Sequence, residues 1–124
     1  MPVDATLPYD DSNIFARILR GELPCKKVYE DQYALAFHDI NPQAPTHILV
    51  IPKGAYVSWD DFSEQASEGE IAGFVRAVGT GARQEGLVPR RYRLLANSGP
   101  HSHQEVPHLH VHIFGGRQMG AMLP

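Results

Sequence analysis

The segment from His108 to Phe114 constrains the fold most, because histidines and apolar residues alternate strictly along its sequence HLHVHIF. Successive side chains of a β-strand point to opposite faces, so a strand here places three imidazoles on one face and Leu109, Val111 and Ile113 on the other. We expect the apolar side to face the core. Neighbouring imidazoles then start about 7 Å apart, twice the rise per residue, which lets two rings reach one phosphate-sized group.

Four other segments have the composition of β-strands and, with the histidine strand, predict a five-stranded antiparallel meander in an α+β fold. They are residues 26–30, 33–38, 46–51 and 92–97. Residues 1–11 show no sustained periodicity and are predicted as a flexible N-terminal arm. Residues 12–124 then form a single domain, because the chain is too short for a second one.

Two amphipathic helices are predicted beside this sheet, both on one face. The short helix is capped by Asp11 or Ser12 and ends at Gly21. The long helix begins at residues with the spacing of a capping box, Ser67 and Glu70, and continues to residue 86. Its internal glycines each cost about 1 kcal/mol relative to alanine, so packing against the sheet must stabilise it.

Charge and cysteine content exclude several classes of protein. With 11 basic and 14 acidic residues the net charge is -3, without the basic excess of a protein that binds DNA or RNA. The single cysteine, Cys25, forms no intrachain disulfide, and the first residues lack the pattern of a secretory signal, so we expect a cytoplasmic protein. No segment approaches the roughly 18 apolar residues of a membrane span.

Three interpretations of the histidine face follow from the residues alone. A neutral imidazole can attack phosphorus and form a phosphohistidine while its neighbours stabilise charge on the oxygens. Alternatively, imidazoles can bind zinc, although three evenly spaced positions of one strand converge poorly on a tetrahedral ion without a fourth ligand from elsewhere. The third interpretation is an exposed, histidine-rich edge strand. We favour attack at phosphorus, because a side chain with a pKa near 6.5 keeps a large neutral fraction at neutral pH.

The same residues resemble a known family. The run HLHVHIF resembles the histidine triad motif, and the segments NIFARILRGELP, AFHDINPQAPTHILVIPK and HIFGGRQM are similar to the Hint branch of the histidine triad (HIT) family over about residues 12–119. This resemblance implies a homodimer that joins two five-stranded sheets. It also implies hydrolysis of purine nucleoside 5′-phosphoramidates through a nucleotidyl-histidine intermediate, with no required cofactor. The alternatives are a zinc-binding protein and a non-catalytic, nucleotide-binding regulatory dimer.

The resemblance also implies roles at the matching positions. His110 corresponds to the nucleophile and His112 to the group that contacts the α-phosphate, with His108 and His47 as the supporting pair. The substrate, AMP or GMP or their phosphoramidates, is expected to meet three groups of residues. The first group, at the ribose hydroxyls, is Asp39 with its neighbours Ile40 and Asn41. The second, beside the phosphate, is Asn97 and Gln104. The third, beside the purine, is Ile14, Phe15 and Ile18.

One position departs from the family pattern. Most Hint proteins have serine three residues before the first triad histidine, whereas this chain has Glu105. An ionised glutamate repels an anionic phosphate and cannot donate a hydrogen bond. We therefore expect Glu105 to turn away from the phosphate or, if it is buried and protonated, to act as a proton donor.

Overall fold

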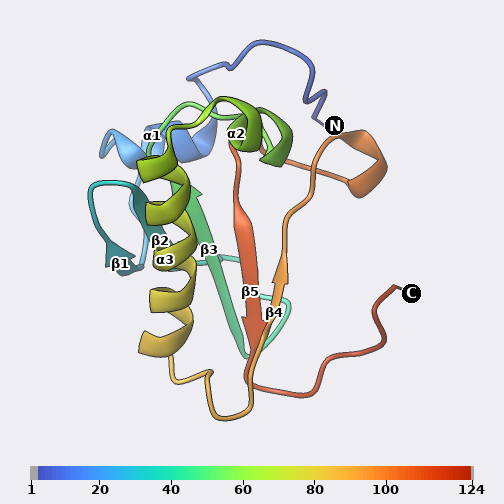
Figure 1. Ribbon diagram of the computed structural model, residues 1–124. Coiled ribbons are helices and arrows are strands. Elements are labelled where there is room, and N and C mark those ends of the chain that lie inside the picture. The colour runs from blue at the N-terminus through green and yellow to red at the C-terminus, as the bar shows by residue number, and fades with distance from the viewer. Residues whose placement is uncertain (1–2, 124) are drawn as a thin grey trace.

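The computed structural model describes residues 3–123 and contains one five-stranded antiparallel sheet, with the strand order β1-β2-β3-β5-β4 (Figure 1). The strands are β1 (Lys27–Glu30), β2 (Ala34–His38), β3 (Thr46–Pro52), β4 (Arg93–Leu95) and β5 (Val111–Gly115). All five strands predicted from the sequence are present, in an α+β fold. The first three form a meander, but β4 lies at the far edge beyond β5, so the complete sheet is not a simple meander.

The histidine strand is shorter than predicted. It was expected to begin at His108, yet β5 begins at Val111. The preceding backbone bonds outside the sheet, because the His108 N–H donates to the Val106 carbonyl at 2.8 Å and the Leu109 N–H donates to the Tyr56 carbonyl at 2.8 Å. His108 and His110 therefore lie on an extended lead-in segment, and among the three triad histidines only His112 belongs to the strand.

Helix α3 (Glu68–Gln84) covers one face of the sheet, where it packs against β1, β2, β3 and β5 (Figure 1). The predicted capping box is present: the Ser67 side chain accepts from the Glu70 N–H, and the Glu70 carboxylate accepts from the Ser67 N–H. Gly73 allows close approach, because a Cβ there would lie 2.2 Å from the ring of Tyr33. This contact explains a glycine that weakens the helix intrinsically.

Helix α1 (Ile14–Leu19) covers the opposite face, so the prediction that both helices share one face is wrong. Phe15 inserts among apolar side chains of β2 and β3 that point away from α3, and its ring meets that of Phe37 edge-on at 5.7 Å. The predicted N-cap is also wrong. The cap is Asn13, whose Oδ1 accepts from the Ala16 N–H at 2.9 Å, and not Asp11 or Ser12.

A third helix, α2 (Trp59–Gln65), was not predicted. It begins after Ser58, whose backbone N–H donates to the Asp61 carboxylate at 2.7 Å, and it buries Phe62 against Phe74 of α3. Two turns of helix with one buried apolar residue give too short a periodicity to recognise in the sequence. A 3-10 turn, η1 (Pro100–Ser102), follows β4.

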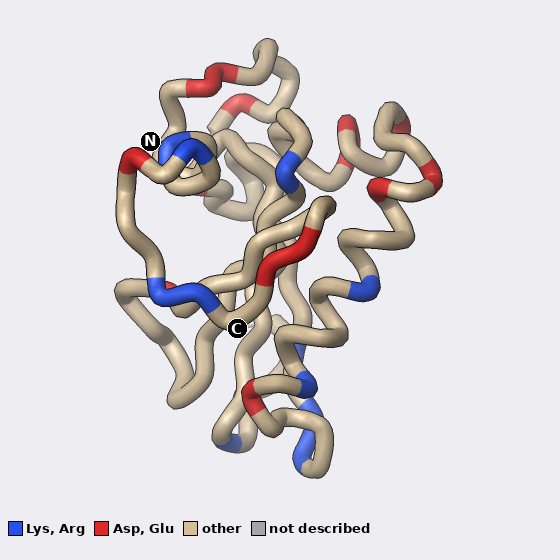
Figure 2. Tube along the Cα trace, turned by 90° about the vertical axis from the view of Figure 1, so that its left-hand side faces the viewer, with Lys and Arg blue, Asp and Glu red and all other residues tan. Residues whose placement is uncertain are grey.

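Positive and negative side chains are interspersed along the described part of the chain (Figure 2). No helix among residues 3–123 is long and apolar enough to cross a membrane. The predicted arm contains no helix or strand in its described part, residues 3–11, although several of its residues contact the domain.

Candidate active site

The three triad histidines lie on the α1 face of the sheet, next to Phe15. The Phe15 ring meets His110 edge-on at 4.9 Å, and the rings of His110 and His112 lie 5.1 Å apart. The intervening Leu109, Val111 and Ile113 are buried in the apolar cluster on the α3 face. The alternation predicted from the sequence is therefore present, even though only part of the segment is a strand.

His110 is held with one specific ring nitrogen free. Its Nδ1 lies 2.8 Å from the backbone carbonyl of His108, and a carbonyl can only accept, so the proton of the neutral ring is on Nδ1. The lone pair is consequently on Nε2. Burial lowers the pKa of His110, so the ring is neutral at neutral pH and Nε2 is available as a nucleophile.

His112 presents the opposite chemistry. The Gln43 N–H donates to Nδ1 of His47 at 3.1 Å, which leaves the His47 proton on Nε2. This Nε2 lies 2.9 Å from Nδ1 of His112, so His112 accepts there and carries its own proton on Nε2. Burial and the neighbouring imidazoles lower the pKa of His112 to about 4. Neutral His110, with its lone pair on Nε2, thus lies beside neutral His112, which carries its proton on Nε2.

His108 has no ring nitrogen left for a ligand. Its Nε2–H donates to the Pro52 carbonyl at 2.8 Å, and its Nδ1 accepts from the Tyr9 hydroxyl at 2.6 Å. The ring is fully buried, and burial lowers its pKa to about 4. Both ring nitrogens are therefore engaged within the chain, and the supporting role of His108 stays a prediction. No local pattern of residues indicated Tyr9, which lies 99 residues away in the predicted arm.

Asp39 lies beside this histidine chain at the edge of a cavity of about 740 Å³. Its Oδ2 is 3.4 Å from Nε2 of His47, and its Oδ1 accepts from the Asn41 N–H at 2.8 Å. Ile40 also lines this cavity and is 91% exposed, so its side chain is free to cover an apolar ligand. Lys26 lies on the opposite part of the lining. We call this space the Asp39 cavity.

The three residues expected beside the purine differ in exposure. Phe15 is buried against the triad, Ile18 packs at the margin of the same apolar cluster, and Ile14 is 47% exposed. Ile14 instead lines a separate cavity of about 290 Å³, together with Asp10, Asn13 and Glu105. We call this second space the Glu105 cavity.

The residues expected beside the phosphate separate into two kinds. Gln104 is 1% exposed, and its amide is fully used inside the chain: Oε1 accepts from the Gly99 N–H, and Nε2 donates to the carbonyls of Val57 and Val106. A phosphate contact through this side chain is therefore wrong. Asn97 is half-buried and lies two residues beyond the end of β4, so its expected place beside the phosphate stays a prediction.

Glu105 is exposed, so the condition of burial for a protonated carboxyl is not met. Its negative charge nevertheless acts on His110, where it opposes the lowering of the His110 pKa. Asp39 acts on His110 in the same direction. Two carboxylates from the linings of different cavities thus act on the His110 ring in the same direction.

Asp39, His47 and His112 also form the one group of potential metal ligands found among residues 3–123. One ligand atom from each lies within 4.8 Å of the others. This set differs from the three triad histidines considered from the sequence, because two of its members come from outside β5. The group thus has the ligands from other elements that the triad alone lacked, and it offers three ligand atoms in all.

Comparison with known proteins agrees with this arrangement. The family model described as HIT domain matches residues 20–119. A 13.2 kDa HIT-like protein of Azospirillum brasilense is 66% identical over 115 residues, covering 93% of this chain and 94% of the relative. The purine nucleoside phosphoramidase of Escherichia coli K12 is 42% identical over 113 residues, covering 91% and 94%. A 14 kDa zinc-binding protein of Zea mays is 47% identical over 111 residues, covering 89% and 86%.

Solved structures show the same fold. A histidine triad protein from Clostridium difficile superposes with a TM-score of 0.83 at 36% identity, covering 94% of this chain and 100% of that one. A HIT family hydrolase from Legionella pneumophila superposes with a TM-score of 0.80 at 43% identity, covering 86% and 95%. With a family model that spans most of its length and relatives of such identity, this chain belongs to the HIT family.

Proposed function

We propose that this protein hydrolyses purine nucleoside 5′-phosphoramidates. The observation that carries the proposal is a pair of neutral rings 5.1 Å apart, His110 with a lone pair on Nε2 and His112 with an Nε2–H donor. The names of the related hydrolase and phosphoramidase support the same chemistry. This arrangement suits a reaction in which a nitrogen attacks phosphorus while a neighbouring donor stabilises the charge on a phosphoryl oxygen.

The reaction then has two steps. Nε2 of His110 forms a bond to the α-phosphorus, the P–N bond breaks, and the departing nitrogen takes a proton from solvent water and leaves as the amine. A water molecule next attacks the phosphorus of the nucleotidyl-histidine and gives up a proton to solvent, the Nε2–P bond breaks with its electron pair returning to Nε2, and the nucleoside monophosphate leaves. His112 donates to a phosphoryl oxygen in both steps, and because its pKa is held low by burial it does so as a neutral ring.

The Asp39 cavity is the proposed place of the nucleoside. An ionised carboxylate has two acceptor oxygens, which suits the paired hydroxyls of a ribose. One oxygen of Asp39 already accepts from the Asn41 backbone, so the other is shared between His47 and the ligand. Exposed Ile40 and partly buried Ile18 provide apolar surface for a purine.

The test is incubation with adenosine 5′-phosphoramidate, followed by chromatographic detection of AMP. We expect the His110→Ala variant to lose at least 1,000-fold in kcat, because the nucleophile is removed. The control is His101→Ala, which removes an exposed imidazole from η1 and should retain activity. Brief reaction with radiolabelled substrate, followed by mass spectrometry, should locate the nucleotidyl group on His110. Tight AMP binding without a labelled histidine would contradict the enzymatic proposal and indicate a nucleotide-binding regulatory protein.

A zinc-binding function is the second candidate, and the Asp39, His47 and His112 group favours it. Two imidazoles and a carboxylate with an open fourth position are a frequent zinc ligand set, and the Zea mays relative is named a zinc-binding protein. Elemental analysis of protein purified without an affinity tag decides between the candidates. Stoichiometric zinc and loss of turnover on chelation would favour the zinc function, whereas undiminished turnover in chelator supports the phosphoramidase.

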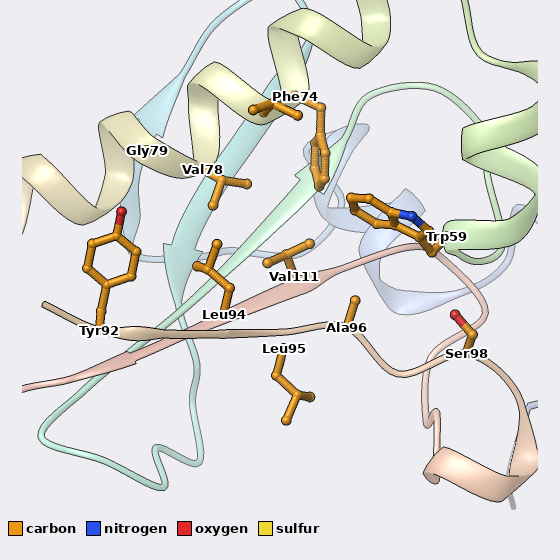
Figure 3. A pocket seen from close by; sticks show the side chains of 11 residues that line it. Trp59, Phe74, Val78, Gly79, Tyr92, Leu94, Leu95, Ala96, Ser98 and Val111 are labelled. Carbon is orange, nitrogen blue, oxygen red and sulfur yellow. The ribbon is translucent and has the colours of Figure 1, made fainter. Parts of the chain in front are cut away.

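We also propose that two copies of the chain associate through β4. This strand is at the edge of the sheet, so one side of its backbone is open to a second β4. Beside it lies an apolar groove of about 740 Å³ between β4 and α3 (Figure 3). Leu94, Val75 and Trp59 line this groove and are 50%, 56% and 44% exposed.

Light scattering after size-exclusion chromatography tests this association. The wild type should have the mass of a dimer, and Leu94→Glu should have that of a monomer, because it buries a charge in the paired groove. Leu7→Glu, which places the same charge at another exposed leucine, is the control and should remain dimeric. A monomeric wild type would contradict the proposal.

A further inference from the structure

Residues 3–11, predicted as a flexible arm, are held against the segment that leads into the triad. Figure 1 shows this part of the chain running across the upper end of the sheet, from beside the η1 turn to α1. Near its beginning, the Val3 N–H donates to the Gln104 carbonyl at 2.9 Å, and the Val3 side chain is 9% exposed. Near its end, the Tyr9 hydroxyl bonds His108. The arm therefore contacts the lead-in segment at two separate places.

Pro52 and Tyr9 together engage both ring nitrogens of His108. The Pro52 carbonyl can only accept, so Nε2 of His108 carries the proton of the neutral ring and donates it at 2.8 Å. Nδ1 then has the lone pair and accepts from the Tyr9 hydroxyl at 2.6 Å. The two rings also meet edge-on, with centroids 5.5 Å apart and planes inclined by 67°. Tyr9 and Pro52 together leave His108 a single tautomer and a single orientation.

The position of His108 matters for His110, because the backbone between them lies outside the sheet. β5 begins only at Val111, so strand pairing does not hold residues 108–110 in place. The His108 carbonyl is nevertheless the acceptor that orients the His110 ring at 2.8 Å. The His108 carbonyl shares its peptide unit with the Leu109 N–H, which donates to the Tyr56 carbonyl at 2.8 Å. That bond and the ring contacts of His108 together constrain the carbonyl that orients His110.

We propose that Tyr9 is a positioning residue for the nucleophile. Its hydroxyl holds His108, the His108 carbonyl holds Nδ1–H of His110, and Nε2 of His110 is thereby aimed at the substrate. The arm is then a working part of the site, although it touches none of the reacting atoms. The kinetic consequence of this inference rests on the proposed function, whereas its geometric consequence does not.

Steady-state kinetics of Tyr9→Phe tests the kinetic consequence. This change removes only the hydroxyl, and we expect kcat for adenosine 5′-phosphoramidate to fall about fivefold to tenfold, the size of one lost hydrogen bond, with little change in KM. The control is Tyr29→Phe, because the Tyr29 hydroxyl donates to Asp31 at 2.9 Å and its ring packs against the apolar cluster on the α3 face of the sheet. The control should retain wild-type kcat.

Nitrogen-15 NMR of the imidazoles tests the geometric consequence independently of turnover. In the wild type, His108 should show a protonated Nε2 and a hydrogen-bonded, unprotonated Nδ1. In Tyr9→Phe the Nδ1 resonance of His108 should move, and the resonances of His110 should move with it, while the melting temperature stays close to that of Tyr29→Phe.

The outcomes separate the two proposals. Unchanged His108 and His110 resonances in Tyr9→Phe, or an unchanged kcat in an active enzyme, would overturn the role of Tyr9. A wild type that hydrolyses no phosphoramidate would overturn the proposed function instead, and the NMR spectra would then decide on Tyr9 by themselves.

Discussion

The same strands present apolar core residues on one face of the sheet and the histidines of the candidate site on the other. On the α3 face, Ile48, Val50 and Ile113 are fully buried in an apolar cluster that closes the core. On the α1 face, the alternate residues of the same strands include His47 and His112, which are linked by a hydrogen bond. Because alternate residues of a strand point to opposite faces, a shift of one residue in register would exchange core and site completely. Strand pairing therefore fixes the chemistry of the site as well as the fold.

The largest contrast is expected from two substitutions at adjacent positions. Val111→Asp buries a charge on the α3 face, and we expect a loss of unfolding free energy of about 4 kcal/mol or more. His112→Asn removes the proposed phosphate donor on the other face, and we expect the fold to persist while kcat falls about 100-fold. Urea denaturation and kinetics measure both effects. Equal stabilities of the two variants would show that the faces are not distinct.

Acid should destabilise the protein through the site face. Burial lowers the pKa of His108 from 6.5 to about 4, so the unfolded chain takes up a proton at a higher pH than the folded chain. The unfolding free energy that comes from burying His108 as a neutral ring is fully present above pH 6.5. It is lost as the pH falls towards 4, by on the order of 3 kcal/mol. Denaturation at pH 7.5, 6, 5 and 4 measures this loss. His108→Asn, which does not titrate, should show a shallower dependence.

A smaller effect is expected where α3 approaches the sheet. Gly73→Ala places a Cβ 2.2 Å from the Tyr33 ring, and we expect a destabilisation of about 2 kcal/mol. Gly69→Ala is the matched control, because its Cβ meets the same tyrosine at an ordinary 3.4 Å. It should be neutral or stabilising by up to about 1 kcal/mol. Thermal unfolding of both variants tests the difference, and similar melting temperatures would contradict it.

The smallest expected effect is at Glu105, on the margin of the site face. Glu105→Gln keeps the size of the side chain and removes the charge, so an anionic substrate should bind more tightly, with KM lowered about threefold. Glu105→Ser restores the residue usual in Hint proteins and should add a donor, raising kcat as well. The effect on KM should weaken at high salt. Unchanged kinetics in both variants would mean that Glu105 turns away from the bound substrate.

Patterns of neighbouring residues in the sequence predicted the features that depend on short sequence separations. The alternation around His110 predicted its face, and the spacing of Ser67 and Glu70 predicted the start of α3. The alternation did not show that pairing starts at Val111, because the Leu109 N–H bonds to Tyr56, more than 50 residues away.

The errors have a common physical cause. Tyr9 bonds His108, and Gln104 bonds the Val57 carbonyl, through single contacts between distant segments, which leave no periodic signal. The placement of α1 opposite α3 likewise depends on which face of β2 and β3 receives Phe15. The amphipathic pattern of a helix shows that it has a buried side and does not show which surface buries it.

The bonding of His108 at both ring nitrogens has a consequence for comparing members of this family. The three histidines of the motif are not interchangeable, since both ring nitrogens of the first, His108, form hydrogen bonds within the chain. A relative that keeps all three letters but has no hydroxyl in the position of Tyr9 leaves one nitrogen of that ring unsupported. If Tyr9 positions the triad as proposed, proteins with identical signatures can differ in turnover because of the segment that precedes their first helix.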